Sequence, residues 1–335
     1  MQPFEGMDWK DRQILFHLDE DGFQSASAIA KKIKTSKQVV SYRIAELQRK
    51  GILRRCCVIV NEAKIGYTFY KFYVKYKSVD KTTEEEMIGF FGRHPNVGLV
   101  DTCDGKYDMF ICVWARDTHH LYKVYKELFG TYGKYFEDVS VSIVETAYNS
   151  KRGYLIGKRT SSEVPLFGGE VEVNPQIDES DKKILAILSK EARSTLVDIA
   201  NELVITPNTA SNRIRKLKEN GVIQGARIVL DRNKVGYLSY KVLVKVDSFD
   251  EKELRRFLRH VTQEPNIIDI DLCLGDWNIE LDVEIENYEA FRKLMLELRT
   301  GFSKLIKSYD SLLVFHEHTY TYYPMGKEYY PISEL

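Results

Sequence analysis

The sequence predicts an α+β protein of two tandem units, each a winged helix-turn-helix followed by a ferredoxin-like βαββαβ domain. Three observations predict this class. Residue types recur at a constant spacing, so that Asp8 matches Asp178 and Gly66 matches Gly236. In each copy, segments with helical periodicity come first and segments of alternating hydrophobicity follow. The 335 residues are 44% hydrophobic and 29% charged, which is typical of a globular chain with two or more domains.

The internal repeat continues without a gap through most of each copy. Its matched pairs include Asp11/Asp181, Ser41/Ser211, Arg43/Arg213, Gly51/Gly221, Tyr67/Tyr237, Asp101/Asp271, Cys103/Cys273 and Gly105/Gly275. Chance does not produce so many agreements at one spacing. The chain is therefore interpreted as two copies of one unit, and each unit has two parts.

The first part of each unit predicts three helices and a strand. In the first copy the helices cover residues 8–18, 25–33 and 35–50, and the strand 52–60 forms the wing. An acidic start suits the positive end of the first helix, and Gly51 is a C-terminal cap for the third. The second copy repeats this at 178–188, 196–203, 206–220 and 222–230, with Pro207 at the first position of its third helix.

The third helix of each copy has the pattern of a DNA-recognition helix. Val40, Ile44 and Leu47 form an apolar face at helical spacing, and short polar or basic residues lie opposite. Such side chains pair with base edges in the major groove. We expect contacts to double-stranded DNA from Ser36, Lys37, Gln38, Ser41, Tyr42, Arg43, Arg54 and Arg55, and from Thr206, Asn208, Thr209, Ser211, Asn212 and Arg213.

Charge differs between the two copies. The formal net charge of the chain is +0, from 49 basic and 49 acidic residues, so only its distribution is informative. Nine basic residues and one acidic residue lie within 31–55, whereas four basic and two acidic residues lie within 201–225. Because phosphate contacts supply most non-specific affinity, the first winged helix is expected to dominate DNA binding. The alternative is that these helices contact protein and that the charges form an ordinary solvated face.

The second part of each unit predicts strand, helix, strand, strand, helix and strand. The expected elements cover 67–78, 83–93, 97–103, 107–115, 117–129 and 139–146, then 237–246, 251–260, 267–274, 277–285, 288–299 and 309–316. Asp104 and Gly105 form a two-residue hairpin turn. This order is a ferredoxin-like sandwich with helices on one face of the sheet. The other, apolar face needs a cover, from the neighbouring copy or another chain.

Taken together, these motifs resemble the Lrp/AsnC (feast/famine) transcriptional regulators over nearly all of both units. The resemblance rests on Asp8-x-x-Asp11-x-x-Ile14-Leu15, Arg43-Ile44-x-x-Leu47-x-x-x-Gly51-Ile52, Gly66-Tyr67 and Gly105-Lys106-Tyr107-Asp108. The second unit has Gly275-Asp276-Trp277-Asn278 at the last motif. The resemblance implies DNA-binding winged helices at 1–62 and 177–232, ligand-binding RAM domains at 63–147 and 233–318, a linker at 148–176 and an aromatic tail at 319–335.

The resemblance also implies a site for a small effector, often an amino acid, where the Gly-x-Tyr-Asp turn lies near a subunit interface. Glycine lets backbone amides approach a carboxylate, and Asp101 or Asp108 could hold an ammonium group. The expected effector residues are Asp101, Gly105, Tyr107, Asp108, Asp271, Gly275, Trp277 and Asn278. The alternative is that the glycines only form hairpins and that Tyr107 and Trp277 pack. It is favoured for the second turn, because Asn278 lacks a carboxylate.

Tandem fusion departs from the usual members, which have one unit and dimerise through their RAM sheets. One chain can form its own pseudo-dimer with two unequal DNA readers, so that a palindromic site becomes unnecessary. Whether the units pair within or between chains stays open at this stage. A homo-oligomer assembled through the RAM domains is expected by resemblance.

An enzyme is the alternative function, because a branch of this superfamily decarboxylates sirohaem. That chemistry would want histidine and arginine around the sheet cavity, and the matching turns contain neither. A sensor that acts on a protein partner is a further alternative. No Ser-His-Asp set, P-loop or Gly-x-Gly-x-x-Gly occurs, so no catalytic residue, cofactor or metal is expected.

The rest of the sequence predicts a soluble, cytoplasmic protein. It contains no apolar run of about 20 residues and no signal peptide, so no membrane association is expected. Its five cysteines include no C-x-x-C pair and are expected to be buried thiols. Tyr148 and Tyr154 of the linker are expected to pack on the first RAM sheet, and the aromatic tail is expected to dock on the surface.

Overall fold

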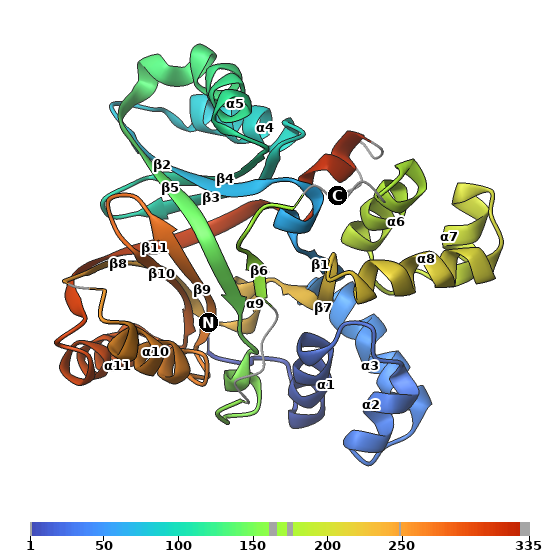
Figure 1. Ribbon diagram of the computed structural model, residues 1–335. Helices are drawn as coiled ribbons and strands as arrows, with labels where there is room; N and C mark the ends of the chain where they lie inside the picture. Colours follow the sequence, from blue (N-terminus) through green and yellow to red (C-terminus); the bar gives the residue numbers. More distant parts are fainter. Residues whose placement is uncertain (1, 161–165, 173–176, 248, 329–335) are drawn as a thin grey trace.

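The computed structural model describes residues 2–160, 166–172, 177–247 and 249–328. Its two three-helix bundles follow the repeat (Figure 1). The first head consists of α1 (Trp9–Glu20), α2 (Ala26–Lys32) and α3 (Lys37–Arg49), and the second head consists of α6 (Glu179–Lys190), α7 (Leu196–Leu203) and α8 (Pro207–Glu219). Asp8 and Asp178 each form a capping box with the aspartate three residues later, which fixes the start of α1 and of α6.

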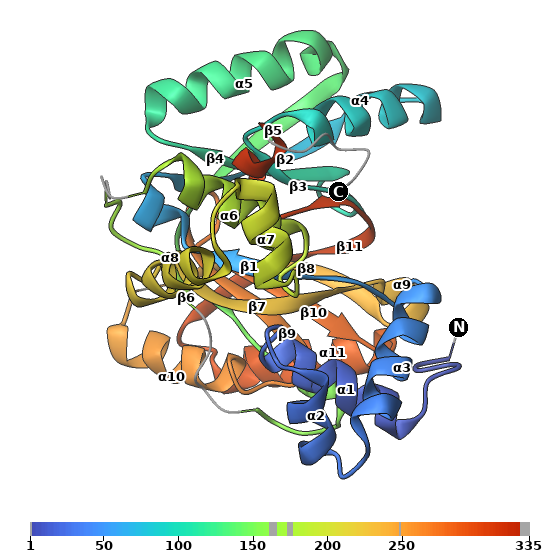
Figure 2. The same ribbon diagram turned by 90° about the vertical axis from the view of Figure 1, so that its right-hand side faces the viewer.

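The strands predicted as wings follow the three helices of each head, and the two strands pair with each other across the units. β1 (Leu53–Val60) pairs antiparallel with β7 (Ile223–Leu230), and Val58 lies opposite Ala226. Nearly every residue of the two strands is buried or half-buried, because each strand supplies the other's hydrogen-bond partners and apolar cover. The two heads lie on the same side of the molecule, one on either side of this ribbon (Figure 2).

The predicted βαββαβ order is confirmed in both units. The first contains β2 (Thr68–Tyr76), α4 (Lys81–Arg93), β3 (Val97–Asp104), β4 (Met109–Ala115), α5 (Thr118–Tyr132) and β5 (Phe136–Asn149). The second contains β8 (Leu238–Val246), α10 (Glu251–Val261), β9 (Ile267–Leu274), β10 (Ile279–Ile285), α11 (Tyr288–Gly301) and β11 (Ile306–Tyr320). Short helices η1 (Glu62–Ile65) and α9 (Arg232–Val235) connect each head to its RAM part.

The two RAM sheets close into one eight-stranded antiparallel barrel. The strand order is β2-β4-β3-β11-β8-β10-β9-β5, and β5 pairs back with β2. Each unit therefore covers the open sheet face of the other, with the helices on the outside (Figure 1). The two units pair within the chain, which the sequence left open.

The last strand of each RAM part is longer than predicted, for a physical reason. β5 has 14 residues and β11 has 15, because each continues past its own sheet to pair with the other unit. Val144 of β5 pairs with Cys273, and Val314 of β11 pairs with Cys103. A single-unit pattern carries no signal for these extra pairs.

The linker packs differently from the prediction. Tyr154, in η3 (Gly153–Leu155), stacks on Tyr237 with ring centroids 4.3 Å apart, and Tyr148 packs on the apolar core of the second RAM part. The expectation that both tyrosines cover the first RAM sheet is wrong, because the end of β5 already lies against β9. β6 (Leu166–Gly168) adds a short strand to β5.

The aromatic tail docks on the surface, as predicted, over its described part, which ends at Glu328. Its η4 helix (Pro324–Glu328) contacts α6, and a Cβ on Gly326 would be 3.3 Å from Ala186. Lys327 Nζ donates to the carbonyl of Gly92 at 2.7 Å. Residues 329–335 and the linker segments 161–165 and 173–176 lie outside the described residues.

Candidate nucleic-acid interface and the barrel chamber

The N-terminal half of α3 presents an open polar face. Ser36 caps the helix by accepting from the amide of Val39 at 3.2 Å. Lys37, Gln38 and Ser41 are exposed, and the Tyr42 side chain has a relative exposure of 68%. The buried face is the predicted one, with Val40, Ile44 and Leu47 in the core. The exposed side chains are therefore available to base edges and phosphates.

Arg43 and Arg213 point toward their own heads instead of outward. Arg43 Nη1 lies 2.8 Å from Asp8 Oδ2 and 2.8 Å from Asp11 Oδ1, while Arg213 Nη1 lies 2.9 Å from the carboxylates of Asp178 and Asp181. Each arginine therefore joins the third helix to the capping box of the first. This contact explains the repeated Asp-x-x-Asp and Arg positions, and DNA contact by these two arginines stays a prediction.

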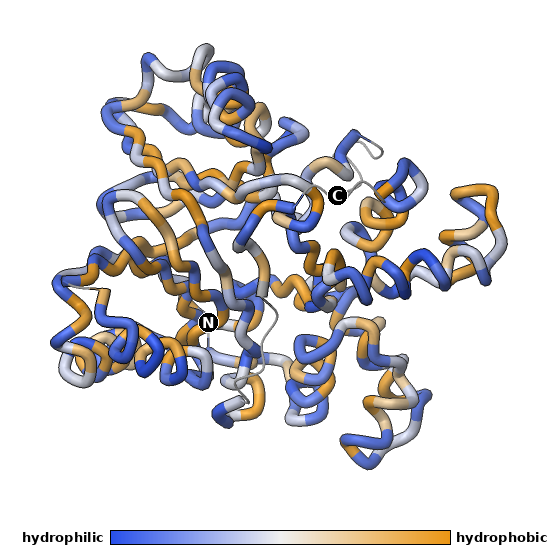
Figure 3. Tube along the Cα trace, in the orientation of Figure 1, coloured by the Kyte–Doolittle hydropathy of each residue, from blue (hydrophilic) through white to orange (hydrophobic). Residues whose placement is uncertain are grey.

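The second head differs from the first in the chemistry of its surface. Thr206 caps α8 by accepting from the amide of Thr209 at 3.1 Å, and Asn208 and Asn212 are exposed while Ser211 is half-buried. On α7 and the turn after it, three large apolar side chains are exposed, namely Leu196, Val197 and Val204. The matching residues in the first head are Ala26, Ser27 and Lys34. Figure 3 shows this hydrophobic stretch at α7.

Arg54 and Arg55 lie at the start of β1 and face the second unit. Arg54 lies 3.5 Å from Glu317 and 3.7 Å from Asp231, and Arg55 donates to the carbonyl of Tyr320. Their partners are more than 170 residues away in sequence, so local sequence patterns could not predict these contacts. A DNA role for this pair stays a prediction, and it would compete with these contacts.

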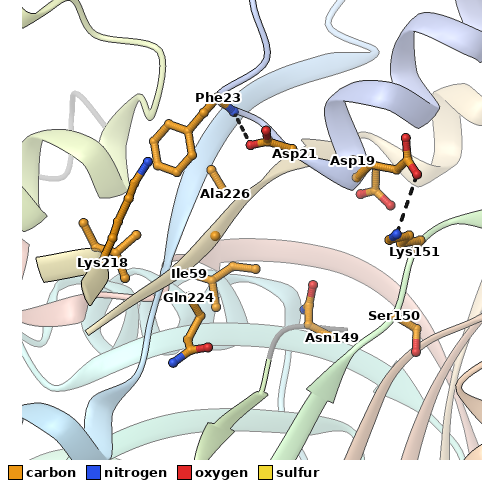
Figure 4. Close-up of a pocket in the computed structure, with 13 residues that line it drawn as sticks. Asp19, Asp21, Phe23, Ile59, Asn149, Ser150, Lys151, Lys218, Gln224 and Ala226 are labelled. Atoms are coloured by element: carbon orange, nitrogen blue, oxygen red, sulfur yellow. Dashed lines mark hydrogen bonds and ion pairs between the residues drawn. The ribbon is translucent and has the colours of Figure 1, made fainter. Parts of the chain in front are cut away.

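A surface pocket of about 360 Å³ joins the two heads to the end of β5 (Figure 4). Lys218 of α8 lies over the ring of Phe23, with Nζ 3.7 Å from the ring centroid. Asp21 accepts from the amide of Phe23 at 3.0 Å. Residues of both heads and of the end of β5 line this pocket.

The predicted effector turns form hairpins whose polar side chains are used within the chain. Asp108 Oδ2 accepts from the amide of Tyr76 at 2.7 Å, and Asn278 Oδ1 accepts from the amide of Val246 at 3.1 Å. Gly105 has φ +136°, and an added Cβ would lie 3.0 Å from the carbonyl oxygen of Ser311. A Cβ on Gly275 would lie 2.7 Å from the carbonyl oxygen of Val141. Both glycines are thus required by close approach of the other unit.

Tyr107 and Trp277 meet across the junction of the two units. Both are buried, their ring centroids are 6.0 Å apart, and the Tyr73 ring lies 4.8 Å from that of Trp277. The Tyr107 hydroxyl donates to Ser140 Oγ at 2.7 Å. The two turns therefore lie at the interface between the two units of the chain, and both aromatic rings pack there. Their effector role stays a prediction.

Asp101 and Asp271 point into the barrel, where polar groups replace the usual apolar core. We name this region the barrel chamber; it consists of a cavity of about 70 Å³ and an adjoining one of about 40 Å³. The two share Leu99, Asp269, Asp282 and Tyr320; Phe69, Trp114 and Asp271 line the larger cavity, and Asp101 lines the smaller.

Lysines inside the barrel hold a buried glutamate in its ionised form. Lys71 Nζ lies 2.6 Å from Glu280 and also contacts Asp271, while Lys241 Nζ lies 2.6 Å from Asp282. Burial opposes ionisation of Glu280, but the charges of Lys71 and Lys241 outweigh it and lower its pKa to about 2. The sequence did not predict this group, because charged residues such as Lys71 and Glu280 in an alternating strand are normally expected to face solvent.

Comparison with known proteins identifies the family. The family described as winged helix-turn-helix DNA-binding matches residues 7–54 and 177–224. An uncharacterized HTH-type transcriptional regulator of Pyrococcus abyssi is 32% identical over 120 residues, which are 36% of this chain and 80% of that protein. The regulatory protein AsnC of Haemophilus influenzae is 34% identical over 89 residues, 22% of this chain and 59% of that protein. The chain belongs to the Lrp/AsnC family.

Its two-unit architecture resembles solved structures of a siroheme decarboxylase along almost the full length. The crystal structure of the siroheme decarboxylase NirDL superposes with a TM-score of 0.62, covering 96% of this Lrp/AsnC chain and 97% of that protein. The identity is 14%, so this likeness concerns the fold alone.

Two further observations bear on the sequence predictions for this Lrp/AsnC member. The five cysteines are unpaired and buried. Within the described ranges, no helix is long and apolar enough to cross a membrane, and no group of His, Cys, Asp and Glu side chains is arranged to hold a metal ion.

Proposed function

We propose that this protein is a sequence-specific DNA-binding transcriptional regulator and that its first head is the main DNA reader. The open face of α3, with Lys37, Gln38, Ser41 and Tyr42 exposed on the more basic head, is the observation that carries this proposal. Side chains of this kind at the start of a recognition helix match the donors and acceptors of the major groove. The regulator names of the sequence relatives support the same function.

The two heads contribute unequally to this function. The second head has fewer basic residues near its third helix and exposes Val197 and Val204 beside it. Phosphate contacts by cationic side chains supply most of the sequence-independent affinity. The second head therefore adds base contacts through Asn208 and Asn212 and little phosphate attraction. Its operator half-site is consequently a weaker one than that of the first head.

A small effector, such as an amino acid, modulates DNA binding from the RAM junction on this proposal. Asp101 and Asp271 support it best among the expected effector residues, because their side chains border cavities inside the barrel. Copies of the chain assemble through the outer surfaces of the RAM domains, since the inner sheet faces already cover each other within one chain.

The enzyme alternative has less support from the interior of the barrel. Sirohaem is a polycarboxylate, and Asp269, Asp271 and Asp282 would oppose its side chains in a cavity of about 70 Å³. Lys71 and Lys241, the two lysines of that cavity, already contact carboxylates of the chain. The barrel chamber therefore favours a ligand of the opposite charge.

Binding to a fragment of the protein's own upstream DNA, titrated against salt and with added amino acids, tests this function. We expect saturable binding that exceeds binding to random DNA and falls steeply with salt. A shift of the affinity on adding amino acids supports the effector part. Absence of any DNA binding at low salt contradicts the regulator function and favours the sensor or enzyme alternatives.

A further inference from the structure

Five buried or half-buried cations of the barrel and its junction with the ribbon each lie between two carboxylates. Lys71 lies between Asp271 and Glu280, Lys241 between Glu280 and Asp282, Arg232 between Asp101 and Glu317, Arg152 between Asp19 and Glu284, and Arg227 between Asp19 and Asp269. Each network therefore begins and ends on a carboxylate. The carboxylates of these networks outnumber the cations, and an excess of negative charge in a low-dielectric interior is costly unless a carboxylate takes up a proton or gains a partner.

The free ends of these networks converge on the barrel chamber. Asp269, Asp271 and Asp282 line its larger cavity, together with the aromatic rings of Phe69, Trp114 and Tyr320. In the adjoining cavity, Asp101 is buried to 97% and its Oδ1 has no hydrogen-bond partner among the described residues. A buried carboxylate oxygen is stable only with a hydrogen-bond donor or a cation beside it. Acidic oxygens and aromatic faces together are the environment that organic cations prefer.

Comparison of the two copies of the internal repeat indicates which chemical group fits beside the buried aspartates of the barrel chamber. In the second copy, the guanidinium of Arg232 lies 3.9 Å from Asp101 and donates to Ser239 Oγ at 2.7 Å. The matching residues of the first copy are Glu62, Asp271 and Phe69. Thus one copy supplies a guanidinium of its own, and the other has a carboxylate where that guanidinium would be.

Glu62 is left without a partner by this exchange. It is buried to 99%, and neither carboxylate oxygen meets a hydrogen-bond donor from another described residue. Burial, followed by the charge of Asp271, raises its pKa to about 8, and burial likewise raises the pKa of Asp269 to about 7. Near neutral pH and without a ligand, Glu62 is therefore mostly protonated and Asp269 partly so, and an arriving cation would displace these protons.

We propose that the barrel chamber binds a small organic cation, an amine or guanidinium compound, whose charge lies against Asp271 as the Arg232 guanidinium lies against Asp101. Glu62 does not line the cavity itself, and it acts on the bound cation through its charge beside Asp271. The site belongs to the effector function proposed above and defines its ligand class. An organic cation fits better than a metal ion, because no metal-binding group occurs within the described part of the chain and the cavity walls are aromatic.

Calorimetric titration of the full-length protein tests this site with methylammonium, 1,4-diaminobutane and methylguanidine, and with 1,4-butanediol as the neutral control. Titrations in two buffers of different ionisation enthalpy measure the protons released. We expect saturable binding of at least one cation, release of protons near neutral pH and no binding of the diol. The absence of saturable binding by all three cations at millimolar concentration overturns the proposal.

Three variants locate the site. Glu62→Arg, which copies the second unit, should weaken cation binding about tenfold or more, equivalent to about 1.4 kcal/mol. Glu62→Gln, which keeps the shape of an already neutral side chain, should fold normally and reduce the protons released. Glu172→Gln, at an exposed carboxylate that pairs with Lys64, should change neither quantity. Unchanged binding and proton release in both folded Glu62 variants overturn the proposal. Because no DNA is present, failure here leaves the DNA-binding function untouched.

Discussion

Arg43 and Arg213, at matching positions, each stabilise the helix packing within their own head by the same contact. Arg43 and Arg213 each bind two carboxylates at the start of the first helix of their head, and only about a quarter to a third of each side chain is exposed. The exposed polar residues that precede Arg43 make no such contact. Substitution of Arg43 should therefore affect mainly stability, whereas substitution of the exposed residues before it in α3 should affect mainly DNA affinity.

Arg43→Ala should lower the free energy of unfolding by about 1–2 kcal/mol. The substitution removes hydrogen bonds to charged groups, which are stronger than neutral ones, and leaves two carboxylates without a partner. Lys37→Ala, one turn earlier and exposed, should leave stability unchanged and weaken DNA binding with a shallower salt slope. Chemical denaturation and DNA titration of both variants measure this. Equal stability of the two variants would contradict the structural role of Arg43.

Glu62 should make stability depend on pH in a defined direction. Its pKa is about 8 in the folded state, compared with an ordinary value of 4.5. Between these values the unfolded state releases the proton and the folded state keeps it, so stability falls as pH rises, by about 1.4 kcal/mol per pH unit. Below pH 4.5 and above pH 8 the effect of this group is constant.

Glu62→Gln removes this dependence. The difference in free energy of unfolding between variant and wild type, measured without amines, should grow in favour of the variant from pH 5 to pH 8. A difference that does not change with pH would mean that Glu62 is ionised in the folded protein.

Among the elements, the turn between the second and third helices carries backbone strain. Lys34 has φ +52° and Val204 has φ +57°, and a β-branched side chain is rare in this left-handed region. Val204 is also exposed, with a relative exposure of 92%, so packing does not compensate.

Val204→Asn should stabilise the protein by about 1 kcal/mol, because asparagine tolerates the left-handed conformation. Val197→Asn, at an exposed position of α7, makes the same chemical change without a positive φ and should not stabilise. Thermal unfolding of the two variants compares them, and a loss of stability in Val204→Asn would show that the turn is not strained.

Element by element, the sequence predicted local structure well and contacts between units poorly. The helices of both heads and the βαββαβ order follow from periodicity and capping residues, which act over a few positions. The ribbon of β1 with β7 and the long ends of β5 and β11 depend on partners in the other unit. The same is true of the candidate site. The open face of α3 was predicted, whereas the partners of Arg54 and the ion networks around Lys71 required the fold.

At the level of the complete chain, tandem duplication places a pseudo-dimer in one polypeptide. The barrel and the ribbon are closed by pairing between the units, so the two heads are fixed side by side at a ratio of one to one. Duplication also frees matched positions to differ, as at Glu62 and Arg232 or at Lys34 and Val204. A symmetric homodimer cannot make such distinctions.

Because its two heads differ, the protein should bind an operator whose two half-sites also differ in sequence. Footprinting on a high-affinity fragment selected from random DNA should show two adjacent half-sites of different sequence, with stronger protection at the one bound by the first head. Two identical half-sites in inverted orientation would contradict unequal reading by the heads.

The most direct test compares matched double variants of the two heads on that fragment. Gln38→Ala with Tyr42→Ala changes the first head, and Asn208→Ala with Asn212→Ala changes the matching positions of the second. We predict that the first pair lowers affinity about tenfold more than the second, since each good base contact contributes about 1–3 kcal/mol. An equal loss in both pairs, or a larger loss in the second, would contradict the assignment of the first head as the main DNA reader.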